Sequence, residues 1–193
     1  MKLDFLNDLL LESVLSSYSK NVCDYILHSN QSEHIVDIEG IGMSYFVTDE
    51  IGKEEDATEK YFEVLNESNK DFALLQIDNG IIKTCETKKC DCAIADDSNL
   101  CFIEFKANAI STNTNQVRKN YRKAMQQLGT TISIFKSGLS SLGKDLGSLR
   151  ELEAYVCFRR GYPRVTSSEI NYQVEFSKNN NGCPLYFEPK KVL

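Results

Sequence analysis

The stretch from Cys90 to Ala107, CDCAIADDSNLCFIEFKA, constrains the fold of this chain more than any other segment. It predicts two short apolar strands joined by a turn, with Asp91 at the start of the first strand. Glu104 and Lys106 lie two residues apart in the second strand, so their side chains point to the same face of a sheet. The sequence thus places a carboxylate beside an ammonium group in an otherwise apolar strand, with a second carboxylate on the neighbouring strand.

The segments around these strands predict a mixed sheet with helices packed against it. Apolar residues recur at helical spacing over residues 3–27 and 113–137. Strands are predicted over residues 34–48, 72–77, 81–86, 153–160, 171–176 and 184–187. We therefore expect an α/β fold with a central mixed β-sheet flanked by helices.

Length and composition are those of one ordinary globular domain spanning residues 1–193, with its core over roughly 70–160. No apolar run approaches the length of a membrane span, and the N-terminus lacks the basic region of a secretory signal, so no membrane role is expected. The seven cysteines are an odd number and several lie in apolar surroundings. We interpret them as reduced thiols, which indicates a cytoplasmic protein.

The net charge of −6 is unevenly distributed along the chain. Residues 1–105 contain 8 Lys and Arg against 22 Asp and Glu, whereas residues 106–164 contain 11 against 3. Such segregation favours a basic face that binds a polyanion, although folding that intermixes the two sets would leave no patch.

Asp91 and Glu104 are ligands of the type that Mg²⁺ or Mn²⁺ prefers, and the backbone carbonyl of Phe105 would add a third oxygen. A bound ion would activate a water molecule and stabilise negative charge on a phosphate. Lys106 would position or deprotonate that water. The alternative is a simple ion pair between Glu104 and Lys106 on a half-exposed strand.

The pattern Asp91…Glu104-Phe105-Lys106, followed by a helix containing Lys-Ala-Met-Gln-Gln-Leu over residues 123–128, resembles the PD-(D/E)XK nuclease superfamily. The resemblance implies a restriction-endonuclease-like αβββαβ core, with the helix over 3–27 packed on it. It also implies Mg²⁺-dependent hydrolysis of nucleic-acid phosphodiester bonds, with DNA favoured over RNA, in antiviral defence or nucleic-acid processing. One departure is that Cys90 precedes Asp91 where the family often has proline.

The same resemblance implies roles for individual residues. Asp91 and Glu104 would bind the metal, Lys106 would be the catalytic lysine, and Gln127 would be a polar helix residue facing the site. Glu12, on the first helix, is the candidate for a further metal ligand. Some members of the superfamily have lost activity, so an inert module that binds nucleic acid or a protein partner is the alternative.

Basic residues on the predicted helix and at the end of a predicted strand are candidates for phosphate contacts. They are Arg118, Lys119, Arg122, Lys123, Arg159 and Arg160. The overall acidity of the chain is unusual for an autonomous DNA-binding protein, which favours a local face or a protein partner, including a second copy of the chain.

Other chemistries are less well supported by the sequence. Phosphate-binding Gly-rich loops and the serine-hydrolase elbow have no matching motif. A zinc site formed by Cys85, Cys90, Cys92 and Cys101 stays open, but a Cys-x-Cys pair lacks the geometry of zinc knuckles. A cysteine nucleophile paired with His28 or His34 has no supporting local motif.

Overall fold

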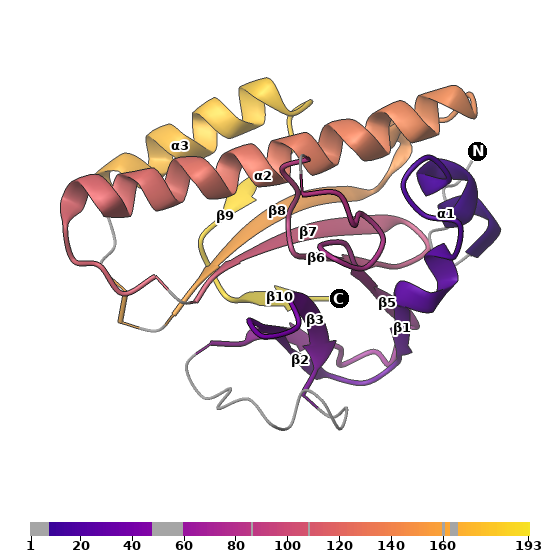
Figure 1. Cartoon of the computed structure of the whole chain (residues 1–193), viewed down its shortest axis with the longest axis horizontal. Helices are drawn as coiled ribbons and strands as arrows, with labels where there is room; N and C mark the ends of the chain where they lie inside the picture. Colours follow the sequence, from indigo (N-terminus) through magenta and orange to yellow (C-terminus); the bar gives the residue numbers. More distant parts are fainter. Residues whose placement is uncertain (1–7, 48–59, 86, 108, 160, 163–165) are drawn as a thin grey trace.

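The computed structural model of the chain describes residues 8–47, 60–85, 87–107, 109–159, 161–162 and 166–193. It shows an α/β fold in which two mixed sheets stack on each other and helices cover the outer face of the larger sheet (Figure 1). The α/β class and the mixed sheet are therefore confirmed. The second sheet was not expected from the sequence.

The first sheet contains six strands in the order β1-β5-β6-β7-β8-β9. Their bounds are Ile26–Ser29, Phe72–Gln76, Cys92–Ala95, Asn99–Lys106, Glu151–Phe158 and Leu185–Tyr186. Neighbours from β1 to β7 are antiparallel, whereas β7, β8 and β9 are parallel. The parallel pair β7 and β8 requires a crossover, and the helix α2, Thr114–Ser141, supplies it.

The second sheet has the order β10-β4-β2-β3, with bounds Lys190–Val192, Phe62–Leu65, Glu33–Ile38 and Met43–Phe46. It lies below the first sheet in Figure 1, while α2 and the helix α3, Thr166–Asn179, lie above it. The last strand, β10, pairs in parallel with β4.

Strand β7 is apolar on both faces because both faces are covered. Leu100 and Phe102 pack in the cluster that includes α2, and Cys101, Ile103 and Phe105 pack in the cluster shared with the second sheet. A strand buried on both sides gives a nearly continuous apolar run rather than an alternating one. The two charged residues of β7, Glu104 and Lys106, fall on the α2 face by the same alternation.

The helix α2 begins where Asn113 caps it, since the Asn113 side chain accepts hydrogen bonds from the backbone N–H groups of Asn115 and Gln116. Its buried face repeats at helical spacing and includes Val117, Tyr121, Ala124, Leu128 and Phe135. The helix predicted over 113–137 is thus confirmed, and it continues to Ser141.

Three local predictions are wrong. Within the described residues the first helix, α1, spans Asp8–Leu15, and residues 3–7 of the predicted helix lie outside them. After a 3₁₀ turn the chain forms β1, where the sequence suggested a helix to residue 27. Residues 171–176 belong to α3, because Tyr172 and Phe176 are buried one turn apart. Residues 81–85 form no strand: Asn79 adopts a left-handed turn with φ of 54°, and a loop follows.

The strands predicted over 34–48, 72–77 and 153–160 are confirmed as β2 with β3, β5 and β8, except that residues 48 and 160 lie outside the described residues. Tyr186 and Leu185 form β9, within the strand predicted over 184–187. Within the described ranges, no helix has both the length and the apolar character needed to cross a membrane.

Candidate active site

The predicted carboxylates come together where β7 ends and β6 begins. Cys92 pairs with Ile103 in the antiparallel register, so Asp91 lies opposite Glu104 one step further along. The backbone N–H of Phe105 donates a hydrogen bond to Oδ2 of Asp91. The carbonyl of Asp91 in turn accepts from the N–H groups of Ile77 and Asp78, both at 3.0 Å, which attaches it to the end of β5.

Glu104 is 1% exposed, and its two carboxylate oxygens differ in their surroundings. Oε1 accepts a hydrogen bond from Nζ of Lys106 in a close ion pair. Oε2 is buried and has no hydrogen-bond partner among the described residues. Because buried polar atoms are nearly always paired, this oxygen is suited to accept from a water or to bind a cation.

Gln127 of α2 connects the lysine to the loop before β6. Its Oε1 accepts from Nζ of Lys106 at 3.1 Å, and its Nε2 donates to the carbonyl oxygen of Lys89 at 2.9 Å. One turn further along α2, the hydroxyl of Thr131 accepts from the backbone N–H of Cys90 at 2.9 Å. These contacts fix the segment that carries Asp91 against the helix.

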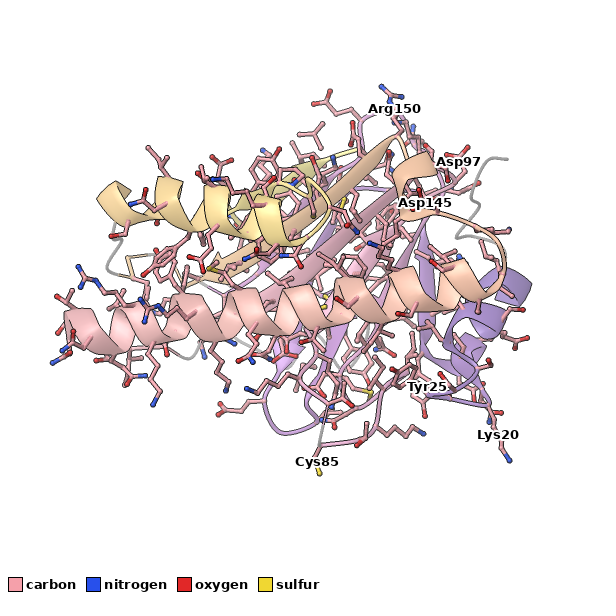
Figure 2. All side chains as sticks on the ribbon, turned by 90° about the horizontal axis from the view of Figure 1, so that it is seen from above. Lys20, Tyr25, Cys85, Asp97, Asp145 and Arg150 are labelled. Atoms are coloured by element: carbon pink, nitrogen blue, oxygen red, sulfur yellow. The ribbon has the colours of Figure 1, made fainter. Side chains whose placement is uncertain are left out.

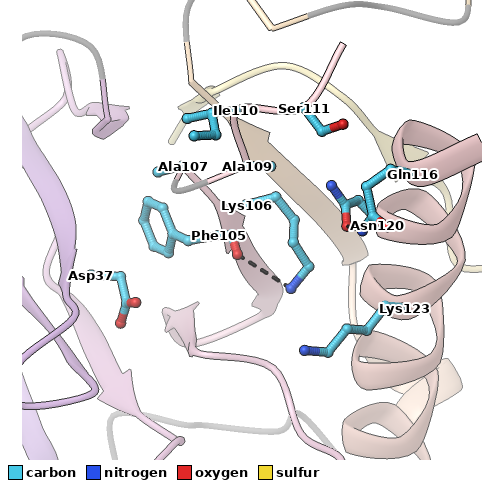
Figure 3. Close-up of a pocket in the computed structure, with 10 residues that line it drawn as sticks. All are labelled: Asp37, Phe105, Lys106, Ala107, Ala109, Ile110, Ser111, Gln116, Asn120 and Lys123. Carbon is cyan, nitrogen blue, oxygen red and sulfur yellow. Dashed lines mark hydrogen bonds between the residues drawn. The ribbon is translucent and has the colours of Figure 1, made fainter. Parts of the chain in front are cut away.

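A pocket of about 410 Å³ opens at the exposed end of this group (Figure 3). Phe105 and Lys106 line it, and Lys123 lies on the α2 side. On the opposite side lies Asp37, at the end of β2 in the second sheet. The candidate site therefore lies at the junction of α2, β7 and the second sheet.

Asp37 is a site residue that sequence analysis missed. It precedes Asp91 by more than fifty positions, and no motif surrounds it. Burial raises its pKa to about 6, with a further increase from the negative charge of Asp78, against the hydrogen bond from Ser44 and the positive charge of Lys106. Only the folding of β2 over the end of β7 brings this carboxyl group to the pocket.

Burial also changes the titration of the two predicted acids. It raises the pKa of Glu104 to about 7, although the ammonium group of Lys106 acts in the opposite direction. The pKa of Asp91 is raised well above its usual range by burial, and by the negative charges of Glu104 and Asp37. Neighbouring carboxyl groups with raised pKa values are typical of functional sites.

These shifts predict that acidification stabilises the metal-free protein. An acid with a higher pKa in the folded state than in the unfolded chain binds its proton more tightly when folded, so unfolding becomes less favourable as pH falls through that window. Between pH 8 and pH 5.5 in EDTA, Glu104 alone should increase the free energy of unfolding by about 2 kcal/mol. Urea unfolding at the two pH values measures this change.

The matched comparison uses Glu104→Gln and Glu175→Gln, since Glu175 is an exposed residue of α3. Glu104→Gln should reduce the pH dependence, and Glu175→Gln should leave it as in the wild type. If the free energy of unfolding increased from pH 5.5 to pH 8 in the wild type and in both variants, the proposed rise in the pKa of Glu104 would be contradicted.

Glu12 does not join the site. It lies on α1, where its Oε1 accepts from Sγ of Cys23 at 3.1 Å. Val14 of the same helix packs tightly against Gly138 of α2, so closely that a Cβ at 138 would lie 2.3 Å from the Val14 carbonyl oxygen. Since Gly138 lies eleven residues beyond Gln127, roughly 16 Å along the helix, α1 packs too far from the site for Glu12 to be a ligand.

The predicted phosphate-binding residues separate onto different surfaces. Lys119 and Lys123 are exposed one turn apart, and Lys123 lines the pocket beside Lys106. Arg122 instead lines a different pocket with Glu175 of α3, and Arg118 lies one turn before it. Arg159 directly follows β8, and Arg160 lies outside the described residues.

The cysteines do not form the alternative zinc site. All seven are free thiols, and Cys85 is exposed in the loop before β6, where Figure 2 shows it extending into solvent. Cys92 and Cys101 are buried between the sheets, where burial raises the pKa of both thiols well above the usual range. Cys90 belongs to the cluster on the opposite face of the sheet.

Across the described ranges, no three or more Cys, His, Asp or Glu side chains are grouped as a ready metal site. The site therefore offers the pair Asp91 and Glu104 together with backbone oxygen, rather than a cage of side chains. Mg²⁺ commonly uses only one or two protein carboxylates and keeps several waters.

Comparisons of the chain with protein-family models, with curated proteins and with solved structures found no match.

Proposed function

We propose that the protein is a metal-dependent nuclease that hydrolyses phosphodiester bonds of nucleic acid, as the PD-(D/E)XK resemblance implies. The observation that carries the proposal is the unpartnered, buried Oε2 of Glu104, which lies beside Lys106 and across from Asp91. The ion pair with Lys106 occupies Oε1 alone, and a cation bound between the two acids would give the buried Oε2 a partner.

The residues present fit a hard divalent cation. Asp91 and Glu104 would supply carboxylate oxygens from just before β6 and from β7, and the Phe105 carbonyl oxygen, 3.4 Å from Nζ of Lys106, would supply a third oxygen. Bound Mg²⁺ or Mn²⁺ would lower the pKa of a coordinated water and offset the negative charge of the reacting phosphate.

The residues of the chain would orient the reaction. Lys106 extends into the pocket and would donate a hydrogen bond to the attacking water or to a phosphate oxygen. Gln127 fixes the position of Nζ through its own hydrogen bond to Lys106, and its second bond to the Lys89 carbonyl fixes the orientation of the amide. Asp91 is oriented by the Phe105 N–H, so the acid and the lysine keep a constant relative position.

A catalytically inert binding module is the second candidate. The observation that favours it is that Lys106 and Glu104 already pair with each other, and that no three-acid cluster is present among the described side chains. In such a module the pair would stabilise the end of β7, and Lys123 would still offer a cation to a polyanion.

Metal-dependent cleavage separates the two candidates. The purified protein should degrade labelled DNA or RNA in Mn²⁺ and should not do so in EDTA, because the metal supplies the activated water. Asp91→Asn should abolish cleavage, whereas Asp97→Asn, at the exposed turn beyond the other end of β6 (Figure 2), should cleave like the wild type. Equal cleavage by all three proteins would indicate a contaminating nuclease and would contradict the proposed site.

A further inference from the structure

The candidate site lies in the middle of a longer groove rather than at the end of a closed pocket. A second pocket, of about 330 Å³, lies beside the first, and Lys123 lines both. Gln127 lines the second pocket and accepts a hydrogen bond from Lys106, which lines the first. The two pockets therefore adjoin at Lys123 and at the hydrogen bond between Lys106 and Gln127, and together they form the groove. The predicted metal ligand Glu104 is the ion-pair partner of Lys106.

One wall of this groove is basic. Lys123 extends from α2 into both pockets, and Lys119 lies one turn before it on the same side of the helix. Lys88 lines the second pocket, where its Nζ donates to Oε1 of Gln126 on α2 at 2.8 Å. Among the described residues, Lys88 and Lys123 form no ion pair, so their charges are available to an anion.

The other wall is acidic. Asp37 of β2 lines the first pocket, and Asp78, just after β5, lines the second. Asp78 pairs with the buried Lys89 at 3.0 Å, so these two charges largely offset each other. Among the described residues, Asp37 forms no ion pair and contributes most of the negative charge on this side. Glu39 follows β2 and adds negative charge near Asp37.

A groove with one basic and one acidic wall accommodates one phosphate backbone and repels a second. Duplex nucleic acid presents two backbones, so docking one of them on α2 would bring the other toward the second sheet and its carboxylates. Like charges that approach within a Debye length, about 10 Å at 0.1 M salt, oppose binding. A single strand avoids this repulsion.

We propose that this groove binds single-stranded nucleic acid, with Lys88 and Lys123 contacting phosphates that flank the bond to be cleaved. The inference rests on the proposed nuclease function and names its substrate class.

Ile110 supports the same assignment. It is 77% exposed although it is a large aliphatic residue, and it lines the first pocket near Lys106. Unpaired bases expose apolar faces that stack or pack on protein side chains, whereas the bases of a duplex are covered by their neighbours. An exposed aliphatic side chain beside the groove therefore offers an apolar surface that an unpaired base can contact.

Fluorescence anisotropy tests the proposal with a fluorescein-labelled 16-nucleotide DNA strand, the same strand annealed to its complement, and the corresponding RNA strand. The measurements are made in 50 mM KCl with EDTA, which removes divalent metal and so prevents cleavage. The single strands should bind at least tenfold more tightly than the duplex. The double substitution Lys88→Gln with Lys123→Gln should weaken single-strand binding about tenfold and should make the dependence of log K on log [KCl] shallower by about 1.4.

The control is Arg118→Gln with Arg122→Gln, which removes two charges from another face of the same helix. It should change single-strand affinity by less than twofold. Duplex binding as tight as single-strand binding, an equal loss in the control, or no single-strand binding would overturn the proposal.

Cleavage in Mn²⁺ distinguishes failure of this inference from failure of the proposed function. The wild type could cleave single strand and duplex equally while Asp91→Asn cleaves neither. That result would support the nuclease proposal and refute the proposal that the groove binds single strands. The protein could instead bind the strands as expected but cleave none of them in Mg²⁺ or Mn²⁺. That result would refute the hydrolytic function and would support the groove as a binding site for single-stranded nucleic acid.

Discussion

Replacement of Lys106 by methionine is expected to lower metal-dependent cleavage at least about 100-fold. Methionine keeps much of the length and apolar bulk of the side chain but removes the ammonium group that contacts Glu104 Oε1 and Gln127 Oε1. The attacking water and the phosphate of the substrate then lose the ammonium group that would orient them. Initial rates of cleavage of a labelled single strand in Mn²⁺ at pH 8 measure the effect.

Two further measurements make this result specific. Lys178→Met, on the exposed face of α3, should cleave at the wild-type rate, since it removes the same charge far from the site. Binding of Mn²⁺ to Lys106→Met at pH 8, followed by calorimetry, should persist because Asp91 and Glu104 remain. A rate within threefold of the wild type would refute the assignment of Lys106 as a catalytic residue.

The second large effect concerns the join between the two sheets. Lys191 of β10 is 7% exposed, and its Nζ lies 2.6 Å from Glu151 and 2.8 Å from Glu153, both on β8 of the first sheet. Lys191→Met removes the cation of both carboxylates, of which Glu153 is mostly buried with 13% of its side chain exposed, whereas Glu151 is 38% exposed. We expect the free energy of unfolding to fall by about 3 kcal/mol, which corresponds to a decrease in Tm of roughly 6–12 °C for a chain of this size.

The neighbouring Lys190 provides the matched control. Its ammonium group pairs with Glu63 at 3.4 Å, and both side chains are substantially exposed, so Lys190→Met should change stability by less than about 1 kcal/mol. Thermal unfolding followed by circular dichroism compares the two variants. Equal Tm values for Lys191→Met and the wild type would show that the buried ion pairs do not stabilise the contact between the sheets.

The ion pairs of Lys191 also bear on the site, because β10 pairs with β4 and β4 pairs with β2, which carries Asp37. A second sheet that is less firmly attached to β8 would position Asp37 less precisely at the pocket. The stability of the join between the sheets and the geometry of the acidic wall are thus physically linked.

The part of the site that sequence predicted depends on short-range geometry. Glu104 and Lys106 share a face because strand side chains alternate, and Asp91 lies opposite because a short turn sets the register of β6 and β7. The relations among these three residues are local in the chain, so they could be inferred without the fold. Gln127 was expected at the site only because the Lys-Ala-Met-Gln-Gln-Leu run resembles the nuclease superfamily, and its contact with Lys106 depends on the packing of α2 against β7.

The remaining features depend on long-range packing. Asp37 reaches the pocket only because the second sheet stacks on the first, and Lys88 only because the loop before β6 lies against Gln126. No local pattern marks either residue. The α3 segment was mistaken for a strand because valine and aromatic residues favour strands, whereas burial of Tyr172 and Phe176 against α2 and β9 fixes it as a helix.

The most direct test of the central claim is anomalous diffraction from crystals of the protein grown or soaked in Mn²⁺. The account predicts one strong anomalous peak within about 2.2 Å of carboxylate oxygens from both Asp91 and Glu104, with Lys106 displaced from Oε1 toward the pocket. Well-diffracting crystals in millimolar Mn²⁺ that show the Lys106–Glu104 pair intact, and no peak between the two acids, would contradict it.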